Sequence, residues 1–150
     1  MAHTFYSLHY HIIFSTKHRE PLIDNSLKDR LFAYMAGIIN NGNGFTRKIN
    51  GTADHVHILA DVKPKIALSN LLRDIKSNSS GWVHDTFPEK SKFGWQIGYG
   101  IFSVSESNIE RVIDYIENQE EHHKKRTFKE EFLKFLQRHH IEYDESHLWD

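Results

Sequence analysis

The stretch Asp54-His55-Val56-His57-Ile58-Leu59-Ala60 decides the fold of this chain. Its histidines precede and interrupt an apolar run, which indicates a strand. Because side chains alternate between the two faces of a strand, His55 and His57 lie on the same face. Two imidazoles placed in this way suit a divalent metal ion. The stretch therefore predicts a strand over 54–62 that carries a pair of metal ligands.

Strands and helices alternate on either side of this stretch. Alternating apolar residues predict strands around 8–15, 45–50 and 95–104, the second of which forms a hairpin with 54–62. Apolar residues repeated every three or four positions predict helices around 27–38, 68–75 and 109–119, and a final one around 127–138. The pattern Ser107-Asn108-Ile109-Glu110 is typical of a capping box at the start of the third helix. The order β-α-β-β-α-β predicts an α+β fold, a ferredoxin-like or RNA-recognition-type sandwich with an antiparallel sheet and added C-terminal helices.

Length and composition limit the possible classes of protein. A chain of 150 residues suits one domain, 1–150, in which 127–150 form a helical, acidic tail. The chain has no cysteine, which excludes disulfides, thiolate metal sites and a cysteine nucleophile. Its N-terminal apolar runs are short and broken by His9, His11 and Lys17, so we expect no signal peptide or membrane span and a cytoplasmic location.

The charge is unevenly distributed along the chain. Residues 1–126 contain 16 Lys and Arg against 14 Asp and Glu, whereas residues 127–150 contain 3 against 6. With a net charge of −1, the protein cannot bind nucleic acid through its overall charge. Any affinity for DNA should therefore come from a local patch and weaken with salt.

Tyr115 and Gln119 are the second pair of residues that suggests chemistry. They are four positions apart on a predicted helix, so they are neighbours on its surface, at the flank of its apolar stripe. A hydroxyl nucleophile beside a carboxamide ligand, together with paired histidines, can break a phosphodiester through a covalent phosphotyrosine. The alternative interpretation is a boundary tyrosine beside a solvated glutamine.

A second histidine pair, His9 and His11, has the same spacing as His55 and His57. Spacing does not distinguish the two pairs. We favour His55 and His57 because a hairpin strand near the middle of the chain gives a site better support. The alternatives for His9 and His11 are a sheet face packed under a helix, a subunit contact or a DNA-binding surface.

These motifs together resemble the single-tyrosine HUH transposases of bacterial and archaeal insertion sequences, the insertion-sequence-200-like group, in which U is a hydrophobic residue. The resemblance spans nearly the whole chain and is weakest after His123. Its landmarks are Phe14-Ser15-Thr16-Lys17-His18-Arg19, Asp54-His55-Val56-His57, the helix of 72–82, Trp95-Gln96 with Gly98-Tyr99-Gly100 and Phe102-Ser103-Val104-Ser105, and Tyr115-Ile116-Glu117-Asn118-Gln119.

The resemblance implies an activity and a set of roles. His55, His57 and Gln119 would hold Mg²⁺ or Mn²⁺, and Tyr115 would attack single-stranded DNA at the hairpin-bearing ends of a mobile element. It also implies a homodimer in which the tyrosine helix of one subunit can complete the histidine site of the other. No nucleotide cofactor is expected, because the chain lacks a phosphate-binding loop motif and Gly98-x-Gly100 is too short for a dinucleotide fingerprint.

Basic and aromatic residues near these motifs are candidates for DNA contacts. Tyr99 and Phe102 are possible stacking surfaces, and the candidate phosphate contacts are Lys17, Arg19, Arg47, Lys48, Arg73 and Lys76. Two other functions remain open: a noncatalytic nucleic-acid-binding module, and a related HUH nicking enzyme for replication or plasmid transfer. The first leaves the H-x-H and Y-x-x-x-Q pattern unexplained, and nicking enzymes usually carry further domains.

Overall fold

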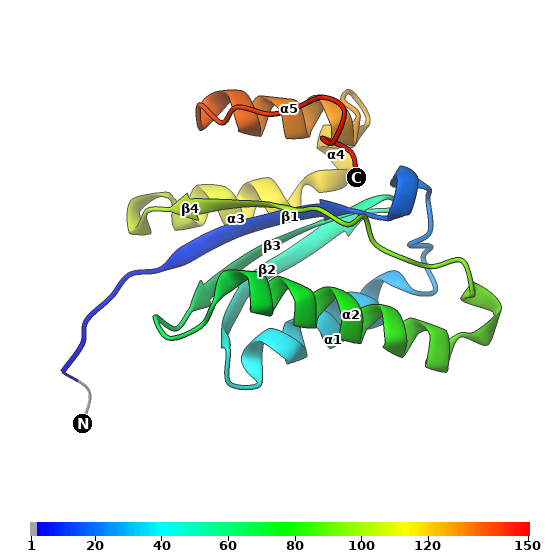
Figure 1. The fold of residues 1–150 in the computed structure, drawn as a ribbon, viewed down its shortest axis with the longest axis horizontal. Helices are drawn as coiled ribbons and strands as arrows, with labels where there is room; N and C mark the ends of the chain where they lie inside the picture. Colours follow the sequence, from blue (N-terminus) through cyan, green and yellow to red (C-terminus); the bar gives the residue numbers. More distant parts are fainter. Residues whose placement is uncertain (1–2) are drawn as a thin grey trace.

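The computed structural model describes residues 3–150 and contains one antiparallel sheet with two helical layers (Figure 1). The sheet has four strands in the order β2-β3-β1-β4. Its strands are β1 (His9–Ser15), β2 (Gly44–Thr52), β3 (His55–Val62) and β4 (Gly100–Val104). This is the ferredoxin-like order predicted from the sequence, with the central strands β3 and β1 enclosed by β2 and β4.

Helices cover both faces of the sheet. On one face lie α1 (Lys28–Asn40) and α2 (Leu68–Thr86), which pack against each other. On the other lie α3 (Ile109–Glu117), α4 (Gln119–His123) and α5 (Phe128–Arg138), with α5 forming the outermost layer in Figure 1. Short 3₁₀ segments at Lys17–Arg19, Pro88–Lys90 and Glu106–Asn108 complete the regular structure of the described residues.

Successive side chains of β1 and β3 point alternately to the two faces of the sheet, and so to the two helical layers. Ile58 pairs with Ile12, and both side chains enter the main core beneath α1 and α2. His57 pairs with Ile13 on the opposite face. This opposite face of the sheet therefore carries histidines. It is covered by α3, α4 and α5 and does not face water.

Helix α5 is held by its own apolar face and by a capping box. Phe128, Phe132 and Leu136 form a cluster with Ile13 and Phe102 of the sheet. Thr127 caps the helix, because its hydroxyl accepts from the backbone N–H of Glu130 and its own N–H donates to the Glu130 side chain. The predicted final helix at 127–138 is therefore confirmed.

Two local predictions are wrong. The strand predicted at 95–104 is shorter, since only Gly100–Val104 pairs with β1 and Trp95 makes a single bridge to Thr16. The segment between Trp95 and Gly100 forms hydrogen bonds with other partners. The Gln96 side chain accepts from the backbone N–H of Ser15, and Gly98 N–H donates to the Asp150 carbonyl.

The predicted capping box at Ser107-Asn108-Ile109-Glu110 is also absent. Helix α3 begins at Ile109 as expected, but its cap residue Asn108 makes no side-chain capping bond. The hydroxyl of Ser107 instead lies 3.1 Å from that of Ser105. The reason is that Ser107 lies inside a 3₁₀ turn, Glu106–Asn108, that leads into the helix, so it does not occupy an N-cap position.

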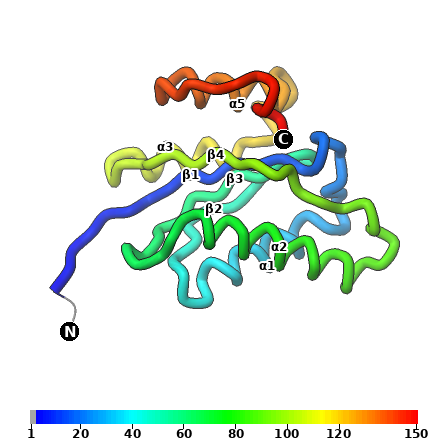
Figure 2. Tube along the Cα trace, in the orientation of Figure 1, coloured from blue at the N-terminus to red at the C-terminus, as the bar shows by residue number. Residues whose placement is uncertain are grey.

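The C-terminal residues return to the turn that follows β1, as the trace in Figure 2 shows. The carbonyl of Asp150 accepts from Gly98 N–H and from the Gln96 side chain, and Arg19 donates to the carbonyl of Trp149. The tail thus packs against the sheet. Within residues 3–150, none of the helices has the length and apolar character needed to cross a membrane.

Candidate active site

Strand β3 carries two imidazoles, and each is oriented by a contact to one of its ring nitrogens. Nδ1 of His55 lies 2.7 Å from Asp54 Oδ1 and 3.0 Å from Thr52 Oγ1. Nδ1 of His57 lies 2.8 Å from Nε2 of His11 on β1. Because the Nδ1 atoms are held in this way, the two Nε2 atoms are left to face a common space. This is the arrangement in which metal-binding histidines are fixed by a second group.

Burial keeps the rings of His57 and His11 uncharged. The pKa of His57 is lowered to about 4, chiefly by burial, although Glu131 acts in the opposite direction. The pKa of His11 is also lowered well below its ordinary value, first by burial and then by His57. A neutral imidazole has a lone pair available for a metal ion, so His57 is in the ligand form near neutral pH.

Gln119 brings a third donor to the histidines. Its side chain is fully buried, and Oε1 lies 3.1 Å from Nε2 of His55. Its amide nitrogen donates to the backbone carbonyl of Tyr115 at 3.2 Å. The carbonyl oxygen therefore faces the histidine, and the alternative of a solvated glutamine does not hold.

Tyr115 and Gln119 are neighbours, but they do not share one helix as predicted. Helix α3 ends at Glu117, and Gln119 begins α4. Asn50 of β2 explains the break, because its side chain donates to the carbonyls of both Ile116 and Glu117 at 3.1 Å. Those carbonyls are at the end of a helix, where backbone acceptors need a partner.

Tyr115 lies over the same histidine face. Its ring centroid is 5.8 Å from that of His57 and 4.6 Å from that of His122, on which it stacks. Its hydroxyl donates to Oε2 of Glu131. Burial, followed by the charge and hydrogen bond of Glu131, raises the pKa of Tyr115 well above its ordinary value. In this arrangement the phenol is strongly held in its protonated form.

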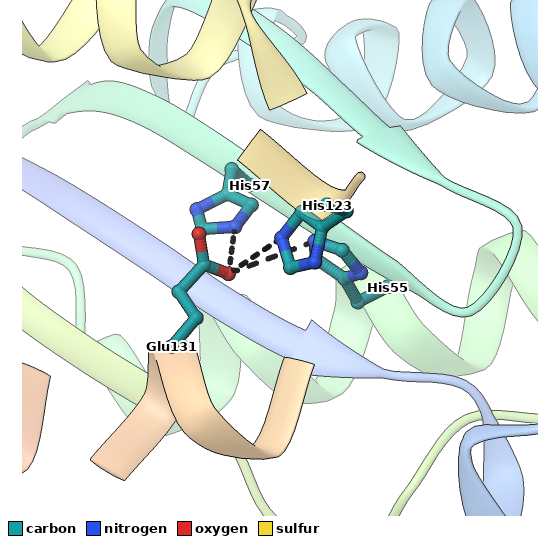
Figure 3. Close-up of side chains that lie close together, drawn as sticks. All are labelled: His55, His57, His123 and Glu131. Atoms are coloured by element: carbon teal, nitrogen blue, oxygen red, sulfur yellow. Dashed lines mark hydrogen bonds and ion pairs between the residues drawn. The ribbon is translucent and has the colours of Figure 1, made fainter. Parts of the chain in front are cut away.

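Two residues at the centre of the site were not predicted from the sequence. Figure 3 shows Glu131 of α5 and His123 of α4 facing His55 and His57. Oε1 of Glu131 lies 2.9 Å from Nε2 of His57, 3.1 Å from Nε2 of His123 and 3.7 Å from Nε2 of His55. The four donor atoms lie within 4.8 Å of one another.

The carboxylate of Glu131 is ionised despite its burial. Burial by itself raises the pKa of Glu131, but hydrogen bonds from His123 and His57 outweigh it and bring the pKa well below its ordinary range. For His123, burial lowers the pKa and Glu131 raises it, and the net result is a raised pKa. A sequence signal for Glu131 did exist: it is an acidic residue on the apolar face of α5, between Phe128 and Phe135.

The other histidine pair divides between two roles. His11 supports His57 and packs under α5, with its ring 5.2 Å from that of Phe135, so a sheet face under a helix is the correct alternative for this residue. His9 lies farther along β1, where it contacts Asp61 at 2.6 Å and Glu106 at 2.8 Å.

Most of the predicted DNA contacts are bound within the chain and do not gather at the site. Lys76 donates to the carbonyls of Ile97 and Gly98, and burial lowers its pKa to about 8. Phe102 is buried beneath α5, whereas Tyr99 is partly exposed. The remaining intramolecular partners are Asp61 for Arg47, Glu117 for Lys48, Asp74 for Arg73 and Trp149 for Arg19. Lys17 lines a surface hollow with Trp95.

A cavity of about 340 Å³ opens beside Tyr115, between α3 and α5 over β4. Arg111, one helical turn before Tyr115, lines it together with Arg138 of α5. Ser103, Asn108 and His139 contribute further polar groups. The cavity therefore combines two guanidinium groups, which suit phosphate, with the edge of an aromatic ring.

Comparison with known proteins places these motifs in a family. The family model described as IS200-like transposase matches residues 4–119. The transposase for insertion sequence element IS200 of Salmonella typhimurium is 26% identical over 129 residues, covering 83% of this chain and 84% of that protein. The ISDra2 transposase TnpA of Deinococcus radiodurans is 27% identical over 119 residues, covering 76% and 85%.

Solved structures share the fold. The crystal structure of a protein assigned as a transposase from Deinococcus radiodurans R1 superposes with a TM-score of 0.64 at 24% identity, covering 79% of this chain and 95% of that one. A REP-associated tyrosine transposase bound to a REP hairpin gives a TM-score of 0.58 at 11% identity, covering 82% and 74%. His55, His57, Tyr115 and Gln119 lie inside the matched family region, and His123 and Glu131 lie after it.

Proposed function

The chain belongs to the family of IS200-like transposases, and we propose that it cuts and rejoins single-stranded DNA through Tyr115. The observation that carries this proposal is the meeting of a tyrosine hydroxyl with the histidines of β3 on one face of the sheet, with Gln119 closing the same space. These groups come from segments about sixty residues apart, and the fold brings them within reach of one another, as a metal-assisted nucleophilic site requires.

The proposed reaction forms a phosphotyrosine. The Tyr115 oxygen attacks the scissile phosphorus, the bond to the 3′-oxygen breaks, and the phenolic proton leaves as the 3′-oxygen takes one up. The 5′-phosphate is then joined to Tyr115. Because one phosphodiester replaces another, a different 3′-hydroxyl can reverse the step and rejoin DNA. No nucleotide cofactor enters this balance.

The donor set fits a divalent metal. His55 and His57 direct their Nε2 atoms toward the same space, and their Nδ1 atoms are held by other groups. The carbonyl oxygen of Gln119 adds the kind of ligand that hard cations prefer. We therefore propose that these three residues hold Mg²⁺ or Mn²⁺, which would offset the charge that develops on the scissile phosphate.

The cavity beside Tyr115 supports an approach for the DNA strand. Arg111 and Arg138 line it, so phosphates on either side of the scissile one would meet positive charge close to the nucleophile. A related protein of the same fold was solved bound to a REP hairpin. On this basis we propose hairpin-bearing single-stranded ends as the substrate.

We also propose that the working form is a homodimer, as the family resemblance implies. The chain offers a place where the tyrosine helix could be exchanged, because α3 is followed by a break at Asn118 before the histidine-facing α4. In the single chain, Tyr115 lies over its own His57. Mixing two inactive variants would separate exchange between subunits from action within one chain.

The direct test is incubation with labelled single-stranded hairpin DNA and Mn²⁺, followed by denaturing gels and peptide mapping. A covalent adduct on Tyr115 that depends on the added metal is the expected result. Binding of the hairpin without any adduct, under all divalent ions tried, would instead favour a noncatalytic binding module.

A further inference from the structure

We infer that His55, His57, His123 and Glu131 form a four-ligand site for a divalent transition-metal ion such as Zn²⁺ (Figure 3). The site shares its β3 histidines with the proposed cleavage site, so the inference rests partly on the proposed function. It differs in its remaining ligands, because His123 and Glu131 come from α4 and α5.

The geometry lies near that of a tetrahedral site. For bonds of about 2.0–2.2 Å, tetrahedral ligand atoms are roughly 3.3–3.6 Å apart. From Oε1 of Glu131, the Nε2 atoms of His57, His123 and His55 lie at 2.9, 3.1 and 3.7 Å. All four donor atoms lie within 4.8 Å of one another, so movements of about an ångström or less would place them around one ion.

The donor atoms select the class of ion. Three imidazole nitrogens and one carboxylate oxygen are typical ligands of Zn²⁺ and other transition-metal ions. Mg²⁺ prefers six oxygen ligands and keeps much of its water, which such a site does not favour. We therefore expect this site to prefer Zn²⁺ over Mg²⁺.

The surroundings support the same ligands. His55 and His57 are fully buried, Glu131 is 2% exposed, and the Nδ1 atoms of both histidines contact groups outside the site. Burying a carboxylate is costly unless opposite charge accompanies it. A dication among these four groups would supply that charge.

Ion binding at this site would also hold the nucleophile. The oxygen of Glu131 that does not face the histidines accepts the hydrogen bond of Tyr115. A Zn²⁺ ion bound to the other oxygen would therefore hold α5 over the histidine face. Tyr115 would remain protonated in this arrangement. Removing Glu131 would leave His55, His57 and Gln119, the donors of the proposed cleavage site, in place.

The experiment measures Zn²⁺ binding to the full chain without DNA, by competition with a chromogenic chelator. The wild-type chain should bind one Zn²⁺ at least about 100-fold more tightly than Mg²⁺. Glu131→Gln and His123→Ala should each weaken Zn²⁺ binding by about tenfold or more. Co²⁺ provides a second readout, since its visible absorption should report four-coordinate binding in the wild type and change in both variants.

Matched controls come from the neighbouring positions. Glu130→Gln keeps the capping box, and His122→Ala removes an exposed imidazole; both variants should bind Zn²⁺ like the wild type. Circular dichroism checks that each variant is folded. If Glu131→Gln does not fold, His123→Ala provides the test. Unchanged Zn²⁺ affinity in a folded Glu131→Gln or His123→Ala variant overturns the site.

The same variants separate this inference from the proposed function. If Glu131→Gln binds Zn²⁺ normally but His57→Ala abolishes Mn²⁺-dependent cleavage, the four-ligand site is wrong and the proposed function stands. If Zn²⁺ binds through all four residues while no condition gives a DNA adduct, the site stands and the proposed function fails.

Discussion

Glu131 accepts a hydrogen bond from the hydroxyl of Tyr115 with one carboxylate oxygen and from His57, at 2.9 Å, with the other. One side chain of α5 thus contacts both the proposed nucleophile and a proposed metal ligand. Movement of α5 would therefore change the environment of both groups at once.

Replacing Tyr115 by phenylalanine should abolish the covalent adduct and strand joining while hairpin binding persists, because only the nucleophilic oxygen is removed. The free energy of unfolding should fall by roughly 1–3 kcal/mol, since buried Glu131 loses a hydrogen-bond donor. Gel assays and thermal unfolding measure the two effects. An adduct mapped to another tyrosine, or undiminished cleavage, contradicts the assignment.

Replacing His55 or His57 by alanine should eliminate cleavage with little effect on hairpin binding, because each removes a proposed metal ligand. His11→Ala should weaken metal binding by about 10–100-fold, as expected for a residue that orients a ligand. His9→Ala is the control, since His9 contacts Asp61 and Glu106 instead. Loss of metal binding in His9→Ala alone would show that the site is misassigned.

Removing the charge of Glu131 should make Tyr115 easier to ionise. Glu131→Gln should lower the raised pKa of Tyr115 toward its ordinary value of 10, although burial keeps part of the rise. The ultraviolet titration of each protein, minus that of the matching Tyr115→Phe variant, isolates this residue. An unchanged difference titration would contradict the role given to Glu131.

The same pKa has a consequence for stability. Because the folded-state pKa of Tyr115 lies above the unfolded value, its contribution to stability is fully present below pH 10 and is lost as pH rises from there toward the folded-state pKa. Equilibrium unfolding in urea at pH 9 and pH 11 should therefore show a smaller loss of stability in Tyr115→Phe than in the wild type.

Mixing two inactive variants, His57→Ala and Tyr115→Phe, should restore cleavage after subunit exchange if the tyrosine helix acts in trans. A mixed dimer then has one site with both defects and one with neither. Analytical ultracentrifugation checks the oligomeric state in parallel. A monomer, or a mixed dimer without activity, argues for action within one chain.

Gly100→Ala should loosen α5, because a Cβ at this position would lie 2.8 Å from Cε1 of Phe132. Trypsin should then cut faster at Lys124, Lys125 and Arg126, which connect α4 to α5. Gly37→Ala is the matched control: it meets nothing within 4 Å in the middle of α1, so it should stabilise the protein by about 0.5–1 kcal/mol. Equal tryptic rates in both variants would contradict the expected displacement.

The parts of the fold that depend on local periodicity could be predicted from the sequence. Alternation in β1 and β3 predicts which face His55 and His57 share, and the helical spacing places Gln119 beside Tyr115. The break at Asn118 could not be predicted in this way, because it depends on Asn50 of a distant strand. His123 and Glu131 join the site only through the packing of α4 and α5, for which periodicity gives no partner.

The boundary of the family match has a consequence for how such a protein can change over generations. His55, His57, Tyr115 and Gln119 lie within residues 4–119, whereas the helix that restrains Tyr115 lies after them. Under the proposed function, mutations in the tail would therefore change the restraint on Tyr115 while the proposed catalytic residues stay unchanged. Selection by the host for less frequent transposition, or by the element for more frequent transposition, would then act on this C-terminal segment separately.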